Sequence, residues 1–179
     1  MPKKEAKKKN VVSSLLTFPL LAWFAWVFAY SVIRLLYDLT GPAQHQLNEA
    51  VNLFAFTETL GIFTYIMSGV SILIIAYILL SIGWKARAKY GLSWQKSAIY
   101  GAIAGVAGFG IWLAVALVFM IAEASLYLLY GAPGRMSYVI AYLGASILPA
   151  AIGLIFWALT GAAGSVLGNV LSEKKNEWA

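Results

Sequence analysis

The sequence predicts an all-α integral membrane protein with four transmembrane helices in two hairpins and both termini in the cytoplasm. The chain of 179 residues is 61% hydrophobic and only 11% charged, whereas soluble domains contain about 25% charged residues. Most of its 13 lysines and arginines lie at the two ends of the chain or within residues 85–96. Because cationic segments stay in the cytoplasm, these three clusters predict an even number of membrane crossings.

The first span is expected over residues 11–37, after a basic cytoplasmic tail at residues 1–10. The run Val11–Ile33 is free of charge and exceeds the roughly 20 residues that a helix needs to cross a bilayer. Its bulky residues and the lack of a small-residue cleavage site favour a retained helix over a cleaved signal peptide. Pro19 is expected to kink this helix or to lie in its first turn.

The second and third spans are expected over residues 56–84 and 96–130, and the cationic segment 85–96 joins them on the cytoplasmic side. Before the second span, residues 43–54 have one apolar face, which predicts a surface helix or an extension of that span. After the third span, the glycines and proline of residues 131–134 predict a tight outer turn.

The last apolar run extends from Met136 to Ser172 and permits two interpretations. As one continuous helix it would be about 55 Å long, against a hydrocarbon core of about 30 Å. Two short spans with a turn would barely fit and would place the C-terminus outside. We favour one span at residues 136–160 with a hinge at Pro149, an apolar extension at 161–172 and a cytoplasmic tail at 173–179. Residues 11–172 then form one transmembrane domain.

Three charged residues are expected at a similar depth near the outer boundary. Arg34, Glu58 and Glu123 lie about 36, 39 and 42 Å from the cytoplasmic ends of the first three spans. A carboxylate in the membrane needs a partner, and an arginine can bridge two of them. We hypothesise an Arg34–Glu58–Glu123 cluster that forms a gate or binding site for a cation or proton, or a substrate site. The alternatives are that these charges tie the helices together or emerge separately into the headgroups. The hydroxyl of Thr57, Ser125 or Tyr127 is expected to complete the hydrogen bonds of the cluster.

Two sets of glycines predict surfaces for helix packing, because close approach of backbones drives helix association in lipid. Gly101, Gly105 and Gly108 lie in the third span. Gly161, Gly164 and Gly168 lie in the apolar extension. Packing within the bundle and contact with another subunit both remain open.

Few residues are suited to catalysis or to metal binding. The chain has no cysteine and one histidine, which excludes disulfides, thiolate sites and a bis-histidine haem within the chain. His45 and Glu49 are spaced like a pair of metal ligands, but a solvated helix face explains them better. No hydroxyl is paired in sequence with a base. We therefore expect no catalytic residues, no metal and no cofactor.

The sequence favours a non-catalytic accessory or structural subunit of a larger membrane protein complex, assembled through the small-residue helix faces. The alternative is a small homo-oligomeric channel or transporter for an ion or small solute, gated by the Arg34–Glu58–Glu123 layer. A third option is an enzyme that modifies lipid headgroups at the outer surface. The expected partners are the lipid bilayer and other membrane subunits or further copies of the chain. We interpret the net charge of +6 as favouring contact with anionic headgroups of the cell membrane, and not as evidence for binding to nucleic acid.

Overall fold

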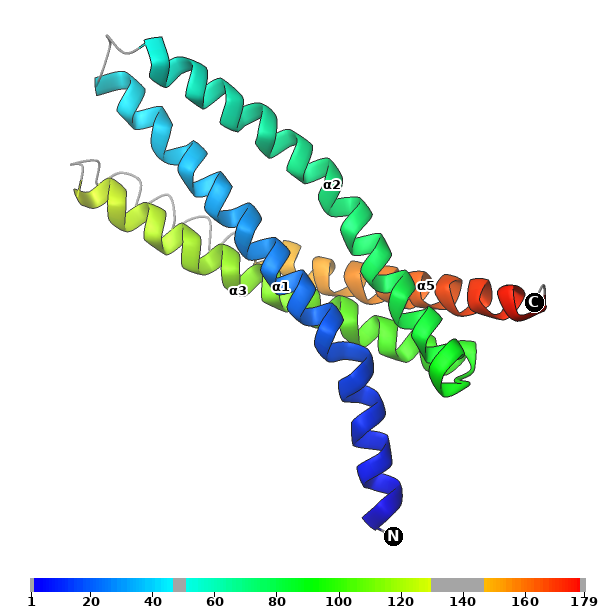
Figure 1. Ribbon diagram of the computed structural model, residues 1–179. Helices are drawn as coiled ribbons and strands as arrows, with labels where there is room; N and C mark the ends of the chain where they lie inside the picture. Colours follow the sequence, from blue (N-terminus) through cyan, green and yellow to red (C-terminus); the bar gives the residue numbers. More distant parts are fainter. Residues whose placement is uncertain (1, 47–50, 130–146, 178–179) are drawn as a thin grey trace. The chain divides into compact units, whose positions relative to one another are not determined.

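The computed structural model describes residues 2–46, 51–129 and 147–177, with side chains described over 11–37, 59, 61–125 and 149–174. These residues form four helices, drawn in Figure 1: α1 (Pro2–Gln46), α2 (Val51–Tyr90), α3 (Trp94–Leu129) and α5 (Ile147–Glu177). No strand occurs within these ranges. The predicted all-helical class is confirmed.

Four segments of these helices are long and apolar enough to cross a membrane. They are Val11–Tyr37, Gly61–Tyr90, Trp94–Ser125 and Pro149–Lys174. Each exceeds the roughly 20 residues that a bilayer requires. The chain is therefore a multi-pass helical bundle by length and composition, as the charge-free runs predict.

The fourth candidate span covers Pro149–Lys174 within the described residues. Residues 161–172, expected as an apolar extension, are helical and continuous with the residues before them. The preceding residues 130–146 lie outside the described part of the chain. Pro149 lies in α5, and its role as a hinge stays a prediction. Pro19 lies in the interior of α1.

The chain divides into two compact units. Unit 1 comprises Met1–Phe24, Leu73–Ile111 and Leu148–Ala179, and unit 2 comprises Ala25–Ile72 and Trp112–Ile147. Helices α1, α2 and α3 each contribute to both units, whereas α5 belongs to unit 1 from Leu148 onward.

The core of unit 1 is formed by apolar side chains from α1, α2 and α3 that pack with the small residues of α5. Its buried members are Leu15, Leu16, Trp23, Ile78, Leu79, Ile82, Ala86, Ala104 and Phe109. Trp23 is among the largest buried side chains, and its ring meets the ring of Trp157 on α5 edge to face, with centroids 5.5 Å apart. Such aromatic pairs add to the burial energy, so Trp23 links α1 to α5.

Unit 2 is held together by paired side chains of α1, α2 and α3. The Trp26 indole N–H donates to Ser71 Oγ at 2.7 Å, and Tyr30 Oη lies 3.1 Å from Ser68 Oγ. As residue numbers increase along α1 from Trp26 to Tyr30, the numbers of their partners on α2 decrease from Ser71 to Ser68. The two helices therefore run antiparallel here. Phe28 and Phe119 meet edge to face at 5.6 Å, which joins α1 to α3.

A short turn with a left-handed glycine connects α2 to α3. Gly91 has φ of 60°, a conformation that is costly for residues with a Cβ and common after a helix end. The Gly91 N–H donates to the Arg87 carbonyl and the Leu92 N–H to the Ala86 carbonyl, each at 2.9 Å. Ser93 precedes α3 and its carbonyl accepts from the Ser97 N–H at 3.0 Å, the position of an N-cap residue.

Candidate functional site

The closest helix contact in unit 1 joins α3 to α5 through glycines. A Cβ on Gly101 would overlap the carbonyl oxygen of Gly161, and a Cβ on Gly161 would overlap the carbonyl oxygen of Gly101. A Cβ on Gly105 would likewise overlap the Trp157 carbonyl oxygen. The two backbones are therefore in direct contact, at a distance where Cα–H groups face carbonyl oxygens.

The same contact continues along both helices in steps of about one turn. Gly105 lies against Trp157, and four residues further along α3 the ring of Phe109 lies against Gly153. As residue numbers increase along α3, the numbers of the residues they contact on α5 decrease, so the two helices are antiparallel. The glycine spacing of four residues matches this register, because residues four apart lie on one helix face.

Three further glycines bring α2 against α5. A Cβ on Gly168 would overlap the Leu80 carbonyl oxygen, and a Cβ on Gly83 would overlap the Ser165 carbonyl oxygen. A Cβ on Gly164 would lie 2.9 Å from the Leu79 Cβ. Helix α5 thus packs on α2 with one part of its small-residue face and on α3 with another.

Gly108 has a different role from its neighbours on α3. Its missing side chain makes room for the indole ring of Trp23 from α1, whose nearest atom would lie 2.6 Å from a Cβ at this position. All six glycines that the sequence singles out therefore lie against residues of the same chain within unit 1.

A buried amide on α5 is the most polar group in the core of unit 1. Asn169 is 2% exposed, and its Nδ2 donates to Ser97 Oγ at 2.7 Å and to the Leu92 carbonyl oxygen at 3.0 Å. Both donors of the amide are satisfied, which a buried polar group requires. Asn169 thereby fixes α5 to the first turn of α3 and to the α2–α3 connection.

Sequence reasoning missed Asn169, although a usable signal was present. It is an amide within the charge-free run of residues 136–172, and a polar side chain in such a run usually faces another helix. Its partner Leu92 could not be identified from the sequence, because it contributes only a backbone carbonyl, a group that every residue has. Ser172, one turn further along α5, is also buried.

Ser165 lies one turn before Asn169, where α2, α3 and α5 meet. Its side chain is completely buried, and its hydroxyl has no hydrogen-bond partner within the described residues. Its carbonyl lies against Gly83 and its Cβ against Gly101. The small volume of serine, and not its hydroxyl, explains why it occupies this position, because a larger side chain would separate the helices.

Of the three charged residues predicted to form a cluster, the structure describes the side chains of two. Arg34 on α1 is exposed and Glu123 on α3 is partly buried; both belong to unit 2, and each has an interaction partner. The side chain of Glu58 lies outside the described residues, as do those of Thr57 and Tyr127. Ser125 donates to the Ile121 carbonyl of its own helix at 2.8 Å. The Arg34–Glu58–Glu123 cluster therefore stays a prediction.

Two serines of α2 form hydrogen bonds both within their own helix and with α1. Ser68 and Ser71 donate to the carbonyls of Thr64 and Met67, and their oxygens also meet the side chains of Tyr30 and Trp26. Each hydroxyl uses its hydrogen locally and its lone pairs across the helix pair. A serine can thus link two membrane helices without leaving a group unsatisfied.

Metal ligands do not gather in the described part of the chain, where no group of three or more histidine, aspartate or glutamate side chains occurs. The side chains of His45 and Glu49 lie outside it. Comparison of the chain with protein-family models, with curated proteins and with solved structures gave no match.

Proposed function

We propose that the chain is a non-catalytic structural subunit of a larger membrane assembly. One observation carries the proposal, namely a face of α2 in unit 2 that combines large exposed apolar side chains with an open glycine. Ile62, Tyr65 and Ile72 are 63%, 82% and 71% exposed, and Ile66 is exposed beside them. Gly69 lies among these residues, and no atom of the described part of the chain lies within 4 Å of a Cβ placed on it.

These residues lie on one side of the helix, because positions 62, 65, 66, 69 and 72 follow spacings of three and four. An open glycine between bulky neighbours forms a notch in which a second helix can approach the backbone. Lipid chains gain little from such a notch, whereas a partner helix gains close contact along its length. This face, defined by Ile62, Tyr65, Ile66, Gly69 and Ile72, is the proposed assembly face.

The glycines of α3 and α5 support a different role. Because Gly101 and Gly161 already meet each other, and Gly105 meets Trp157, a partner helix would have to displace contacts within the chain. We therefore assign the glycine contacts of unit 1 to internal packing and the assembly face to the partner.

We further propose that α1–α2 and α3–α5 form two hairpins, with both termini on the cytoplasmic side. The antiparallel contacts within each pair support the hairpins. In unit 1 Tyr90 Oη donates to Ser14 Oγ at 2.7 Å, Asn169 binds the Leu92 carbonyl, and Arg87 pairs with Glu173. These contacts bring together the start of the first candidate span, the α2–α3 connection and the end of α5, which supports three cationic clusters on one side of a membrane.

Native mass spectrometry after gentle solubilisation tests the assembly role. We expect a particle heavier than the 19.4 kDa chain that contains a different membrane subunit. Gly69→Leu, which fills the notch, should release that subunit without lowering the melting temperature. Gly110→Leu is the matched control, because Gly110 is also open but lies on α3.

A monomer, or equal loss of the partner in both variants, would contradict the assembly face. A particle made only of multiples of the chain would contradict the accessory role and favour the homo-oligomeric channel or transporter. That second candidate rests on Arg34 and Glu123, which lie in the same unit and are both engaged in interactions. Its direct test is ion flux into proteoliposomes, which Glu123→Gln should abolish if the charged layer is the gate.

A further inference from the structure

Two lysines at the end of α2 lie in an environment that differs from that of the arginine between them. Arg87 pairs with the Glu173 carboxylate of α5, so its charge is compensated. Lys85 Nζ lies 5.3 Å from the centroid of the Phe18 ring, and Lys89 Nζ lies 5.5 Å from that of Tyr90. Within the described residues neither lysine has a carboxylate partner.

Helix α1 contributes Phe18, which Lys85 contacts, on a face that also carries hydroxyls and a further apolar side chain. Ser14, Thr17, Phe18 and Leu21 are exposed and follow the spacing of one helix face. The Tyr90 hydroxyl donates to Ser14 Oγ, and the cation–π contact of Lys85 with Phe18 lies one turn further along α1. These two contacts hold the α1 and α2 faces together within unit 1.

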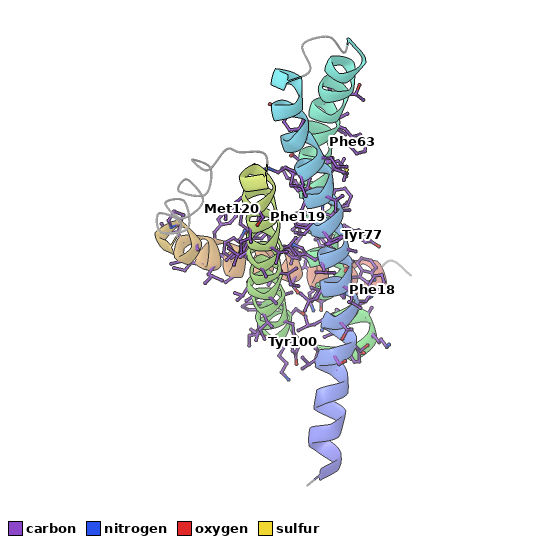
Figure 2. All side chains as sticks on the ribbon, turned by 90° about the vertical axis from the view of Figure 1, so that its left-hand side faces the viewer. Phe18, Phe63, Tyr77, Tyr100, Phe119 and Met120 are labelled. Carbon is purple, nitrogen blue, oxygen red and sulfur yellow. The ribbon has the colours of Figure 1, made fainter. Side chains whose placement is uncertain are left out.

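Polarity changes along this surface in the way that a phospholipid requires. Phe18, labelled in Figure 2, is 68% exposed and Leu21 is 60% exposed, so both offer apolar surface to acyl chains. Lys85 and Lys89 follow on the side toward the end of α2. Both lysines lie in the last turns of the second candidate span, Gly61–Tyr90, and a lysine near the end of a membrane helix extends its ammonium group to headgroup level.

We propose that Ser14, Thr17, Phe18, Lys85 and Lys89 form a binding site for the phosphate of an anionic phospholipid headgroup. The two ammonium groups neutralise the phosphate. The Thr17 hydroxyl lies 3.3 Å from the Ser13 hydroxyl, so it can accept from Ser13 and donate its own hydrogen to a phosphate oxygen. Phe18 orients Lys85 and, with Leu21, contacts the first carbons of the acyl chain. The ring restricts the lysine before the lipid binds, which lowers the entropy lost on binding.

This inference is independent of the proposed structural role. A general attraction between basic residues and an anionic membrane would depend only on the number of charges near the surface. If Lys85 and Lys89 form a specific site, substituting them must weaken lipid binding more than substituting two other lysines of unit 1. Lys96 and Lys174 supply that comparison.

The test measures retention of phosphatidylglycerol on the detergent-solubilised full chain by native mass spectrometry, with phosphatidylcholine as the neutral lipid. Lys85→Gln/Lys89→Gln should weaken phosphatidylglycerol retention by at least about tenfold, since a direct hydrogen bond between an ammonium group and a phosphate contributes about that factor. Lys96→Gln/Lys174→Gln, which removes the same charge, should change retention less than about threefold. Phe18→Leu should weaken it less than the double lysine variant does.

Lys85→Arg/Lys89→Arg keeps both charges and should retain the lipid, which distinguishes loss of the site from loss of the fold. Equal weakening by the two double glutamine variants would overturn the site in favour of general surface attraction. Competition by millimolar inorganic phosphate would overturn the lipid as ligand and indicate a free-anion site. Equal retention of phosphatidylcholine and phosphatidylglycerol would also contradict the proposal.

Discussion

At the scale of single residues, the polar groups of this chain stabilise contacts between helices. Asn169 donates two hydrogen bonds to groups on and before α3, and Trp26 and Tyr30 each meet a serine of α2. Hydrogen bonds between membrane helices contribute about 0.6 kcal/mol on average. Their geometry matters beyond this energy, because each bond selects one register of the two helices.

Asn169→Ala should lower the stability of the chain in detergent by about 1–2 kcal/mol, because two hydrogen bonds are lost and the Leu92 carbonyl is left without its donor. The measurement is thermal unfolding followed by circular dichroism. Thr160→Val serves as control, since the Thr160 hydroxyl donates only to the Phe156 carbonyl of its own helix. A melting temperature lowered equally in both variants would show that Asn169 has no special role.

A double-mutant cycle between Trp26 and Ser71 tests the link between α1 and α2. Trp26→Phe and Ser71→Ala should show a coupling energy of about 0.5–1 kcal/mol, because each substitution removes the same hydrogen bond. A cycle between Trp26→Phe and Ser125→Ala should give none, since Ser125 bonds within α3. Additive effects in both cycles would argue against the antiparallel contact of unit 2.

At the scale of helices, stability in unit 1 depends on how closely the backbones approach. The α3–α5 contact places carbonyl oxygens against glycine Cα atoms, so any side chain there acts as a spacer. Gly110 lies on another side of α3, and among the described residues nothing lies within 4 Å of its Cβ position. Whether a glycine lies in a helix contact, like Gly101, or faces open space, like Gly110, therefore depends on its position on the helix.

Gly101→Ala should therefore destabilise the chain by about 1–3 kcal/mol, the usual cost of overpacking. Gly110→Ala should leave the stability unchanged or raise it by up to about 1 kcal/mol, because alanine favours a helix more than glycine does. Unfolding in mild detergent with a titrated denaturing detergent measures both. If Gly101→Ala proved as harmless as Gly110→Ala, the direct backbone contact of α3 and α5 would be contradicted.

The element boundaries show how far the sequence can predict this fold. The number of apolar runs long enough to cross a membrane was predictable, because charges and turn residues separate the first three runs. The start of the fourth run was not predictable from charge, since residues 136–172 lack charges that would mark a membrane surface. Its expected beginning at residue 136 lies outside the described residues and stays a prediction.

The candidate sites were less predictable than the spans. GxxxG spacing indicates that Gly101 and Gly105 contact a helix, but only tertiary structure identifies α5 as that helix. Lys85 and Lys89 read in sequence as general surface charge, and their relation to Phe18 depends on contact between α1 and α2. The partners of Arg34 and Glu123 depend on helix rotation, which the sequence pattern leaves undetermined because the spans are apolar on nearly every side.

At the scale of the whole molecule, every functional proposal depends on where the ends of the helices lie relative to the membrane. The assembly face needs α2 to cross the bilayer, and the lipid site needs Lys85 and Lys89 at a headgroup surface. Both follow if the α2–α3 connection and the two termini share the cytoplasmic side. An odd number of crossings would separate Lys174 from Lys89 by the thickness of the membrane.

Single-cysteine labelling of intact cells tests this arrangement most directly. The chain has no cysteine of its own, so Lys89→Cys, Lys174→Cys and Thr40→Cys each introduce one reactive thiol. With a membrane-impermeant maleimide we expect Thr40→Cys to react in intact cells, and Lys89→Cys and Lys174→Cys to react only after permeabilisation. Labelling of either lysine position from outside, before permeabilisation, would contradict the four-span arrangement with both termini in the cytoplasm.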